Sequence, residues 1–359
     1  MEYYVCLTYR CNMRCSYCCA WRVVNKQGKA DMSPEHLEAV IDYIRKGDDR
    51  NENAVVFSGG EPLLVPELIK EIVERTSDKG LKYRLFTNGM LLDRVPLDIL
   101  QPLDTIFVSM DGDKESHEKH RGKGTYDRIL ESLRAVKPHL KGFVMGRITV
   151  EEETNIYRSV TNLLDYVDGV YWQLVSKPAF NDMERFKANY KRDLRQLFDF
   201  WMEHLKRGRV LNLVPFQTVV SAMLYDYDNN GVSFRCGAGW MIQVIDLDGN
   251  VYWCDEYVGD EKGMFGNIYD GKPLKPPYRK HTEIFEDCRN CEISSICLGR
   301  CRKCLEEYSL EQKRMYCDLT RFLVSMIQAR IDEIRDIVAK KYRTVRDFYN
   351  VPYCTEEIP

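Results

Sequence analysis

Short β-rich segments alternate with helical patterns through roughly the first 210 residues, and this regularity is what most constrains the fold. Segments rich in β-branched and aromatic residues predict strands. The six strand candidates are EYYVCLT (2–8), NAVVFSG (53–59), YRLFTN (83–88), TIFVSMD (105–111), FVMGRITV (143–150) and GVYWQLV (169–175). Strand–helix repeats of this kind indicate a parallel sheet, either an incomplete (β/α) barrel or an open doubly wound sheet. In both folds the active site gathers at the carboxyl ends of the strands.

Helix signals fill the spaces between these strands. Residues 33–46 begin with a serine suited to the N-cap and a proline at the first helical position. Residues 183–208 predict a long polar helix, and residues 319–342 predict an amphipathic closing helix. Between them, MIQVIDLDGNVYWC (241–254) predicts a hairpin that turns at Asp248-Gly249.

Charge and hydropathy exclude several classes of protein. The chain has 359 residues, of which 52 are basic and 55 acidic, so nothing indicates a nucleic-acid partner or a membrane-binding patch. The longest apolar runs are too short to span a bilayer. The N-terminus MEYYVCLTYR lacks the parts of a secretory signal. We therefore expect a cytoplasmic protein whose 14 cysteines are reduced thiols and metal ligands rather than disulfides.

The cysteines are unevenly distributed along the chain. Five lie before residue 20, the next eight lie between Cys236 and Cys317, and Cys354 stands alone near the end. This distribution predicts two metal-rich regions separated by a metal-free scaffold. Cys6, Cys19 and Cys354 are expected to be packing or incidental thiols rather than ligands.

The first group places Cys11, Cys15 and Cys18 on one tight loop, at C-x3-C-x2-C spacing, after the first predicted strand. Soft thiolates favour an iron–sulfur cluster over a hard cation. A [4Fe–4S] cluster takes four ligands, so three cysteines leave one iron free, whereas a zinc site takes four protein ligands. Cys19 is poorly placed as a fourth, because adjacent residues rarely direct both side chains at one cluster. A zinc loop is the alternative on this stretch alone.

This loop resembles the signature of the radical S-adenosylmethionine (SAM) superfamily, C-x3-C-x-aromatic-C, with Tyr17 at the aromatic position. In that family the open iron is chelated by the amino and carboxylate groups of SAM. An electron from the cluster cleaves the sulfonium and yields a 5′-deoxyadenosyl radical. The cofactor carries this chemistry, and the protein positions it and excludes side reactions. The resemblance implies an α/β fold built as a partial (β/α)6 TIM-like barrel.

Further motifs resemble the SAM-binding parts of the same family. SGGEP (58–62) follows the second strand, and its backbone and carboxylate are implied to meet the SAM amino group, since glycines allow close approach. VSMDG (108–112) is implied to bind the ribose, and the arginine of HEKHRGKG (117–124) is implied to pair with the SAM carboxylate. His117 and His120 are expected to be surface or loop histidines. The predicted SAM-contacting residues are Tyr17, Ser58, Gly59, Gly60, Glu61, Ser109, Asp111 and Arg121.

The later cysteines resemble the seven-cysteine pattern of the SPASM extension, found on radical SAM enzymes that modify peptides and proteins. A zinc ribbon is the alternative, but it would leave three of these cysteines unexplained. The pattern is Cys236-x12-Gly249-x4-Cys254, then Cys288-x2-Cys291-x5-Cys297-x3-Cys301, then Cys317. The resemblance implies two auxiliary [4Fe–4S] clusters, and so three clusters in all: an outer one on Cys288, Cys291, Cys297 and Cys317, and an inner one on Cys236, Cys254 and Cys301. It divides the chain into a barrel (1–215), a connector (216–231), a SPASM domain (232–320) and a closing helix with tail (321–359).

The inner set has only three cysteines. An iron there is open unless Cys304 or an aspartate closes it. An open iron would bind a substrate thiolate, whereas a closed cluster would serve only as an electron relay. Asp255, directly after Cys254, resembles a proposed base of sulfatase-maturating relatives, and a hydrogen bond to local backbone is an equally consistent role.

These inferences predict a radical SAM enzyme that modifies a peptide or protein side chain under anaerobic conditions. The preferred prediction is a maturase of ribosomally made peptides, forming a thioether, a carbon–carbon crosslink or a related oxidation. It rests on the missing inner ligand and on a chain that starts directly on the first strand. The alternatives are an anaerobic sulfatase-maturating enzyme, which makes formylglycine from Cys or Ser, and a non-catalytic iron–sulfur electron-transfer protein. The predicted partners are a peptide or protein substrate, a flavodoxin- or ferredoxin-like electron donor and a separate leader-binding protein.

Overall fold

A computed structural model describes residues 1–25, 28, 30–47, 53–176, 180–225, 233–271, 274–341, 348 and 358–359. The chain divides into two compact units. The first comprises Met1–Met110, His117–Met145 and Gly237–Tyr278, and the second comprises Asp111–Ser116, Gly146–Cys236 and Arg279–Pro359.

A largely parallel sheet forms the centre of the first unit. The strands are β1 (Glu2–Thr8), β2 (Ala54–Gly59), β3 (Lys82–Thr87), β4 (Thr105–Ser109), β7 (Ile242–Ile245), β8 (Asn250–Tyr252) and β9 (Met264–Asn267). They lie in the order β4-β3-β2-β1-β7-β8-β9, and β1 to β4 pair in parallel. Every residue of β1 is buried, as expected for a strand covered on both faces. The predicted α/β fold with a parallel sheet is confirmed.

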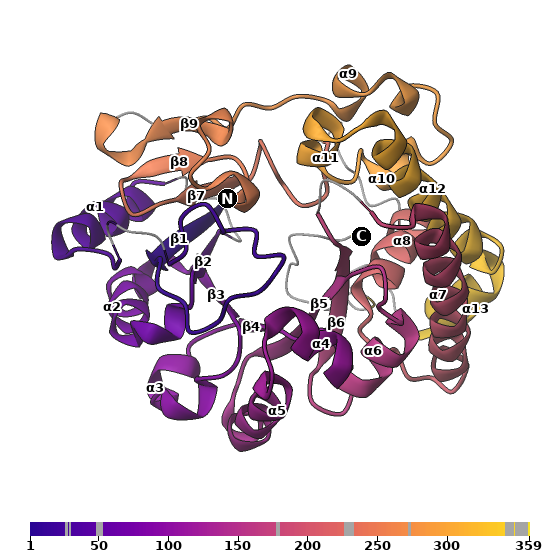
Figure 1. Ribbon diagram of the computed structural model, residues 1–359, viewed down its shortest axis with the longest axis horizontal. Coiled ribbons are helices and arrows are strands. Elements are labelled where there is room, and N and C mark those ends of the chain that lie inside the picture. The colour runs from indigo at the N-terminus through magenta and orange to yellow at the C-terminus, as the bar shows by residue number, and fades with distance from the viewer. Residues whose placement is uncertain are drawn as a thin grey trace. The chain divides into compact units, whose positions relative to one another are not determined.

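Helices α1 (Pro34–Arg45), α2 (Pro66–Thr76), α3 (Leu97–Leu100) and α5 (Thr125–Val136) belong to the first unit. Figure 1 shows α1, α2 and α3 flanking the strands on one side. The predicted start of α1 is confirmed, because the Ser33 side chain accepts a hydrogen bond from the His36 amide over 3.2 Å.

The predicted hairpin is present as β7 and β8, which pair antiparallel with Gly249 in the left-handed conformation (φ +80°) at the turn. The SPASM resemblance assigned this hairpin to a separate cysteine-rich domain (232–320). In the structure β7 instead pairs in parallel with β1, from Glu2–Ile242 to Val5–Ile245. The residues around 242–267 therefore extend the sheet of the first unit, and all four residues of β7 are buried there.

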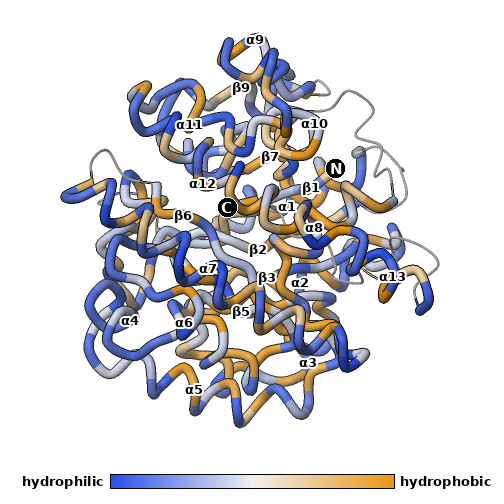
Figure 2. The backbone as a smooth tube through the Cα atoms, turned by 90° about the vertical axis from the view of Figure 1, so that its right-hand side faces the viewer, coloured by the Kyte–Doolittle hydropathy of each residue, from blue (hydrophilic) through white to orange (hydrophobic). Residues whose placement is uncertain are grey.

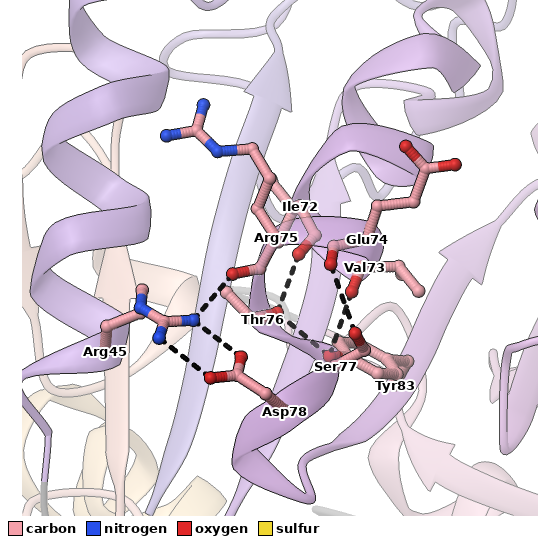
Figure 3. Close-up of polar contacts among 9 residues, drawn as sticks. All are labelled: Arg45, Ile72, Val73, Glu74, Arg75, Thr76, Ser77, Asp78 and Tyr83. Atoms are coloured by element: carbon pink, nitrogen blue, oxygen red, sulfur yellow. Dashed lines mark hydrogen bonds and ion pairs between the residues drawn. The ribbon is translucent and has the colours of Figure 1, made fainter.

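Polar contacts connect α1 and the end of α2 with the end of the sheet where β3 begins (Figure 3). Arg45, in the last turn of α1, donates to both carboxylate oxygens of Asp78 at 2.6 and 2.8 Å and to the Arg75 carbonyl at 2.8 Å. The Thr76 hydroxyl, which is buried, lies 2.9 Å from the hydroxyl of Tyr83, near the start of β3. These groups stabilise the amino-terminal side of the strands, opposite the side where chemistry is expected.

The second unit contains β6 (Gly169–Leu174), and β5 (Phe143–Val150) runs from the first unit into it. Its helices are α6 (Ile156–Leu163), α7 (Met183–Lys206), α8 (Val214–Leu224), α9 (His281–Ile284), α10 (Ser294–Cys297), α11 (Arg302–Glu307), α12 (Leu310–Gln328) and α13 (Ile331–Lys341). Helix α4 (Lys114–Arg121) starts in this unit and ends in the first. None of the described helices is both long enough and apolar enough to cross a membrane.

The C-terminal helices differ from the single closing helix that was predicted. The pattern over 319–342 is divided into α12 and α13, which are separated at Ala329–Arg330. The Arg330 amide bonds to the Ile327 carbonyl, three residues back, so the α-helical ladder is interrupted there. In addition, α8 occupies most of the described part of the predicted connector, 216–225.

Candidate functional site

The loop after β1 carries the first three predicted ligands, Cys11, Cys15 and Cys18, all half-buried. The Cys18 amide donates to the Cys15 carbonyl over 3.3 Å, and the Cys11 amide donates to the Asn25 side chain over 3.0 Å. Burial raises the pKa of Cys11 to about 11, and the nearby thiols of Cys15 and Cys18 add to the rise. The loop therefore gathers the three thiols closely enough for their charges to interact.

Two positions of the SGGEP segment must be glycine, because the backbone that enters the cysteine loop passes too close to them for a side chain. A Cβ on Gly60 would lie 2.1 Å from the Arg10 carbonyl oxygen, and one on Gly59, where φ is +125°, would lie 2.4 Å from the Thr8 carbonyl oxygen. The backbone of this segment bonds to the same carbonyls, Gly60 to Thr8 at 2.7 Å and Glu61 to Arg10 at 2.9 Å. The glycines thus fix the end of β2 against the start of the cysteine loop, and their contact with SAM stays a prediction.

Glu61 is fully buried between the ends of β2 and β3. Its carboxylate accepts hydrogen bonds from the Thr87 hydroxyl (2.7 Å) and from the amides of Asn88 (2.7 Å) and Leu63 (3.1 Å). Burial raises its pKa to about 7, and these three donors oppose the rise. The Asn88 side chain then donates to Asn12 in the cysteine loop over 2.6 Å. This network was not predicted from the sequence, where its signal is the TNG motif (87–89) after β3.

Helix α4 is hydrophilic along its length (Figure 2), yet its last residue, Arg121, is buried. The guanidinium carbon of Arg121 lies 5.2 Å from the centre of the Tyr17 ring, so two predicted SAM contacts meet. The His120 ring nitrogen Nδ1 lies 2.7 Å from the Ser16 hydroxyl. The prediction that His117 is a surface or loop residue is wrong: it lies in α4, is fully buried and bonds the Thr125 hydroxyl over 3.1 Å.

The remaining predicted SAM contacts lie at two strand ends. The Ser58 side chain lies near β1, and its hydroxyl donates a long hydrogen bond to the Val5 carbonyl over 3.4 Å. Ser109 is half-buried at the end of β4. Asp111 belongs to the second unit, where its buried carboxylate accepts a hydrogen bond from the Thr149 amide over 3.0 Å. Their contacts with a ribose stay predictions.

The four cysteines predicted to hold an outer cluster line one pocket of the second unit. Burial, together with the neighbouring thiols, raises the pKa of Cys288 to about 12 and that of Cys297 to about 11. Cys304 lines the same pocket, and burial raises its pKa to about 12. The pocket is lined by Cys288, Cys291, Cys297, Cys304, Cys317, Arg300, Lys313, Tyr316 and Arg321, among others.

The three predicted inner ligands are divided between the units. Cys236 packs in the second unit against a buried apolar cluster of Phe234, Phe285 and Leu305. Cys254 lies in the first unit, where its thiol donates to Asp255 Oδ1 over 3.5 Å. That Asp255 oxygen also accepts the Glu256 amide, so it makes the local backbone bond considered above.

A [4Fe–4S] cluster is ligated by cysteine thiolates, and both the loop and the pocket contain such cysteines. In the described part of the chain, no group of three or more Cys, His, Asp and Glu side chains converges closely enough to hold a metal ion as it stands. Of the thiols expected to be incidental, Cys6 is buried in β1 and Cys19 is half-buried, while Cys354 lies outside the described residues.

Comparison with known proteins agrees with this arrangement. Residues 5–158, which include the cysteine loop, the SGGEP segment and α4, match the family model of the radical SAM superfamily. The chain belongs to the radical SAM superfamily and has a cysteine-rich C-terminal region. Members of this superfamily use a [4Fe–4S] cluster and SAM, and the residues of the loop fit that cluster.

Similar proteins extend over most of the chain. A cysteine-type anaerobic sulfatase-maturating enzyme of Clostridium perfringens is 27% identical over 344 residues, which cover 86% of this chain and 90% of the relative. A serine-type anaerobic sulfatase-maturating enzyme of Bacteroides thetaiotaomicron is 23% identical, covering 82% and 80%. The solved structure of histidine-tagged anSMEcpe with bound AdoMet superposes with a TM-score of 0.77 at 21% identity, covering 97% of this chain and 98% of the other. This last likeness shows the fold.

Proposed function

We propose that this radical SAM enzyme oxidises a cysteine or serine side chain of a protein substrate to formylglycine, as an anaerobic sulfatase-maturating enzyme. The observation that carries the SAM chemistry is the three-thiol loop fixed by β2, β3 and α4. The similarity to two sulfatase-maturating enzymes over more than four fifths of the chain supports the substrate class. This departs from the peptide maturase preferred on sequence alone.

Residues of this chain would hold SAM beside the first cluster. Cys11, Cys15 and Cys18 would bind three irons, and bound SAM would supply the radical that abstracts hydrogen from the substrate. Arg121 is buried next to Tyr17, where its guanidinium would face the SAM carboxylate. Glu61 acts as a positioning residue, because its carboxylate oxygens already accept three hydrogen bonds.

Two auxiliary [4Fe–4S] clusters complete the proposed cofactor set. The outer one would use the four cysteines of the pocket, and the inner one would use Cys236, Cys254 and Cys301. A flavodoxin- or ferredoxin-like protein would supply electrons. With the first cluster, this set predicts about twelve irons per chain.

Asp255 is the proposed proton acceptor from the substrate. In this structure its Oδ1 accepts a hydrogen bond from the Cys254 thiol over 3.5 Å. A metal-bound Cys254 is a thiolate and has no proton to donate. Asp255 would then keep only the Glu256 amide bond and could accept a proton from a substrate hydroxyl or thiol.

The peptide-maturase function is the second candidate, and one observation favours it. Cys304 lines the outer pocket with the four predicted outer ligands, which favours an inner set without a fourth thiol. An open inner iron would suit a substrate thiolate. A leader-binding protein would be needed only for this second function. A non-catalytic electron carrier is disfavoured, since it has no use for a buried Arg121 stacked on Tyr17 at the loop.

The test is an anaerobic assay of the iron-loaded enzyme with SAM and dithionite. Peptides carrying a sulfatase-type Cys or Ser segment should yield an aldehyde that a hydrazide traps, together with 5′-deoxyadenosine. The Asp255→Asn variant should still cleave SAM but lose most of the aldehyde. Cleavage of SAM without aldehyde on any sulfatase peptide would favour the peptide maturase, and no 5′-deoxyadenosine with clusters intact would contradict an enzyme of this family.

A further inference from the structure

The outer cysteine pocket contains two arginines that ligation of iron does not require. Arg300 and Arg321 line the same pocket as the four predicted ligands of the outer cluster. They come from different segments: Arg300 precedes α11 in the turn between Cys297 and Cys301, and Arg321 lies in α12. Two fixed positive charges therefore face one set of thiols.

Arg321 contacts a predicted ligand directly. Its Nη2 donates to the Cys291 sulfur over 3.6 Å, and its Nε lies 3.3 Å from a Glu292 carboxylate oxygen. The glutamate side chain is 70% exposed and the arginine 40% exposed. Glu292 thus orients the guanidinium from the solvent side, while the other end of the guanidinium reaches the sulfur.

Arg300 is held more tightly. Its guanidinium carbon lies 4.3 Å from the centre of the Tyr316 ring. Its Nε has no contact with solvent and no hydrogen-bond partner among the described residues. The charge is therefore held in a site with little water, where its field is weakly screened.

The backbone that presents Arg300 is strained. Leu298, Gly299 and Arg300 all have positive φ, at +54°, +81° and +55°. Residues other than glycine rarely adopt this conformation. A Cβ on Gly299 would lie 2.3 Å from the Cβ of His281, so this turn is also closely packed. Strain of this kind is maintained at functional sites, and here it places a cation among thiols.

We propose that Arg300 and Arg321 raise the reduction potential of an outer [4Fe–4S] cluster held by Cys288, Cys291, Cys297 and Cys317. The inference rests on the proposed function only for the presence of that cluster. Reduction adds one electron and makes the cluster more negative, with no bond made or broken. A nearby positive charge stabilises the reduced form more than the oxidised form, and a hydrogen bond to a ligand sulfur acts in the same direction.

The experiment is an anaerobic redox titration of the iron-loaded full chain, with dithionite as the electron source and electron paramagnetic resonance as the readout. The signal of the outer cluster is the one that Cys317→Ala removes. The Arg300→Met and Arg321→Met variants should each lower its one-electron reduction constant at least about tenfold, or about 59 mV. The signal of the cluster on the N-terminal cysteine loop should not move.

Two further variants make the result specific. Arg314→Met is the matched control, because Arg314 lies in the same helix but pairs with Asp287 and is 63% exposed, so its charge is screened. It should leave the potential within a threefold change. Arg300→Lys keeps the charge and should restore most of the potential lost in Arg300→Met.

Each outcome supports or contradicts the effect of the two arginines on the reduction potential. Unchanged potentials at full iron content in both Met variants would overturn the proposal. Loss of outer-cluster iron in both would also overturn it, since the arginines would then build the site rather than tune it. If Cys317→Ala leaves the iron content unchanged, no outer cluster is bound at this pocket and the proposal fails. A shifted potential in an enzyme that forms no formylglycine would support this inference and contradict only the proposed function.

Discussion

The N-terminal cysteine loop and the outer cysteine pocket offer the same thiol chemistry in contrasting surroundings. The loop has three half-buried predicted ligands, and polar groups from β2, β3 and α4 fix it. The pocket has four predicted ligands, beside an apolar cluster that contains Phe234 and Phe285. A buried carboxylate and backbone donors surround the first site, and arginine side chains line the second.

This difference separates two tasks for a cluster. A cluster that binds a cofactor needs an open iron and a polar wall that is already arranged, because reorganising that wall during the reaction would be costly. A cluster that only carries electrons needs every iron ligated and a surrounding charge that sets its potential. The loop has the features of the first kind, and the pocket those of the second.

The strongest test of this contrast removes the loop ligands. Replacing Cys11, Cys15 and Cys18 together by Ala should abolish 5′-deoxyadenosine formation, because no iron would remain for SAM to bind. About two thirds of the iron should remain, since the two proposed auxiliary clusters would use ligands outside the loop. Chromatographic detection of 5′-deoxyadenosine and an iron assay measure the two results.

The control for that experiment is Cys19→Ala, in the same loop. Cys19 is half-buried and is not a predicted ligand, so the variant should keep its iron and at least half of its SAM cleavage. Equal loss of iron in Cys19→Ala and in the triple variant would contradict the assignment of three ligands.

Removing one pocket ligand should have a smaller effect on SAM cleavage. Cys317→Ala should lower iron from about twelve to about eight atoms per chain and leave SAM cleavage within about threefold of the wild type. Formation of the final product should fall much further, because the electron path would be broken. Cys304→Ala is the matched comparison: it removes a thiol from the same pocket and should leave the iron count unchanged. An iron loss equal to that of Cys317→Ala would make Cys304 a ligand.

A single methyl group tests how the strand ends hold the loop. In Gly60→Ala the new Cβ would lie 2.1 Å from the Arg10 carbonyl oxygen, so the backbone entering the loop must shift. SAM cleavage should fall at least about tenfold, since small displacements of a reacting group have large effects on rate. The free energy of unfolding should fall by about 1–3 kcal/mol in a urea titration. Gly80→Ala, where nothing lies within 4 Å of the new Cβ, should cleave SAM normally.

Much of this arrangement could be predicted from the sequence. Strong local signals marked the strands: β1 and β5 have the bounds predicted, and the other four begin or end within two residues of the prediction. Cysteine spacing indicated the loop because a tight loop brings its own residues together, whereas the pocket also takes Cys317 from α12. The Ser33 cap and the Gly249 turn were equally local, so they were predicted correctly.

Long-range contacts were the part that sequence did not reveal. The pairing of β7 with β1 joins residues more than 230 positions apart, and no local pattern specifies it. His117 was expected at the surface or in a loop, yet it is buried by packing that only the folded chain defines. The same holds for Arg300, whose pocket is made by α12 as well as by its own turn.

The smallest effect concerns Glu61, the buried carboxyl of the loop region. Its pKa is about 7 in the folded protein, above the ordinary value of 4.5, because burial disfavours the charged form. At a pH between these two pKa values, the Glu61 carboxyl is ionised in the unfolded chain but still protonated in the folded chain. Stability contributed by this group is therefore fully present below pH 4.5 and is lost as the pH rises through 7, by about 3 kcal/mol at most.

Glu61→Gln should remove that part of the pH dependence. Glutamine presents an NH₂ group in place of one carboxylate oxygen, so the amide of Asn88 loses its acceptor and the variant should be about 1 kcal/mol less stable at pH 5. Urea midpoints at pH 5 and 7.5 should then differ less in the variant than in the wild type. Glu67→Gln, an exposed position in the first turn of α2, should keep the wild-type difference. A variant as pH-dependent as the wild type would mean that Glu61 is ionised throughout this range, and that the polar wall of the loop carries a negative charge which the outer pocket lacks.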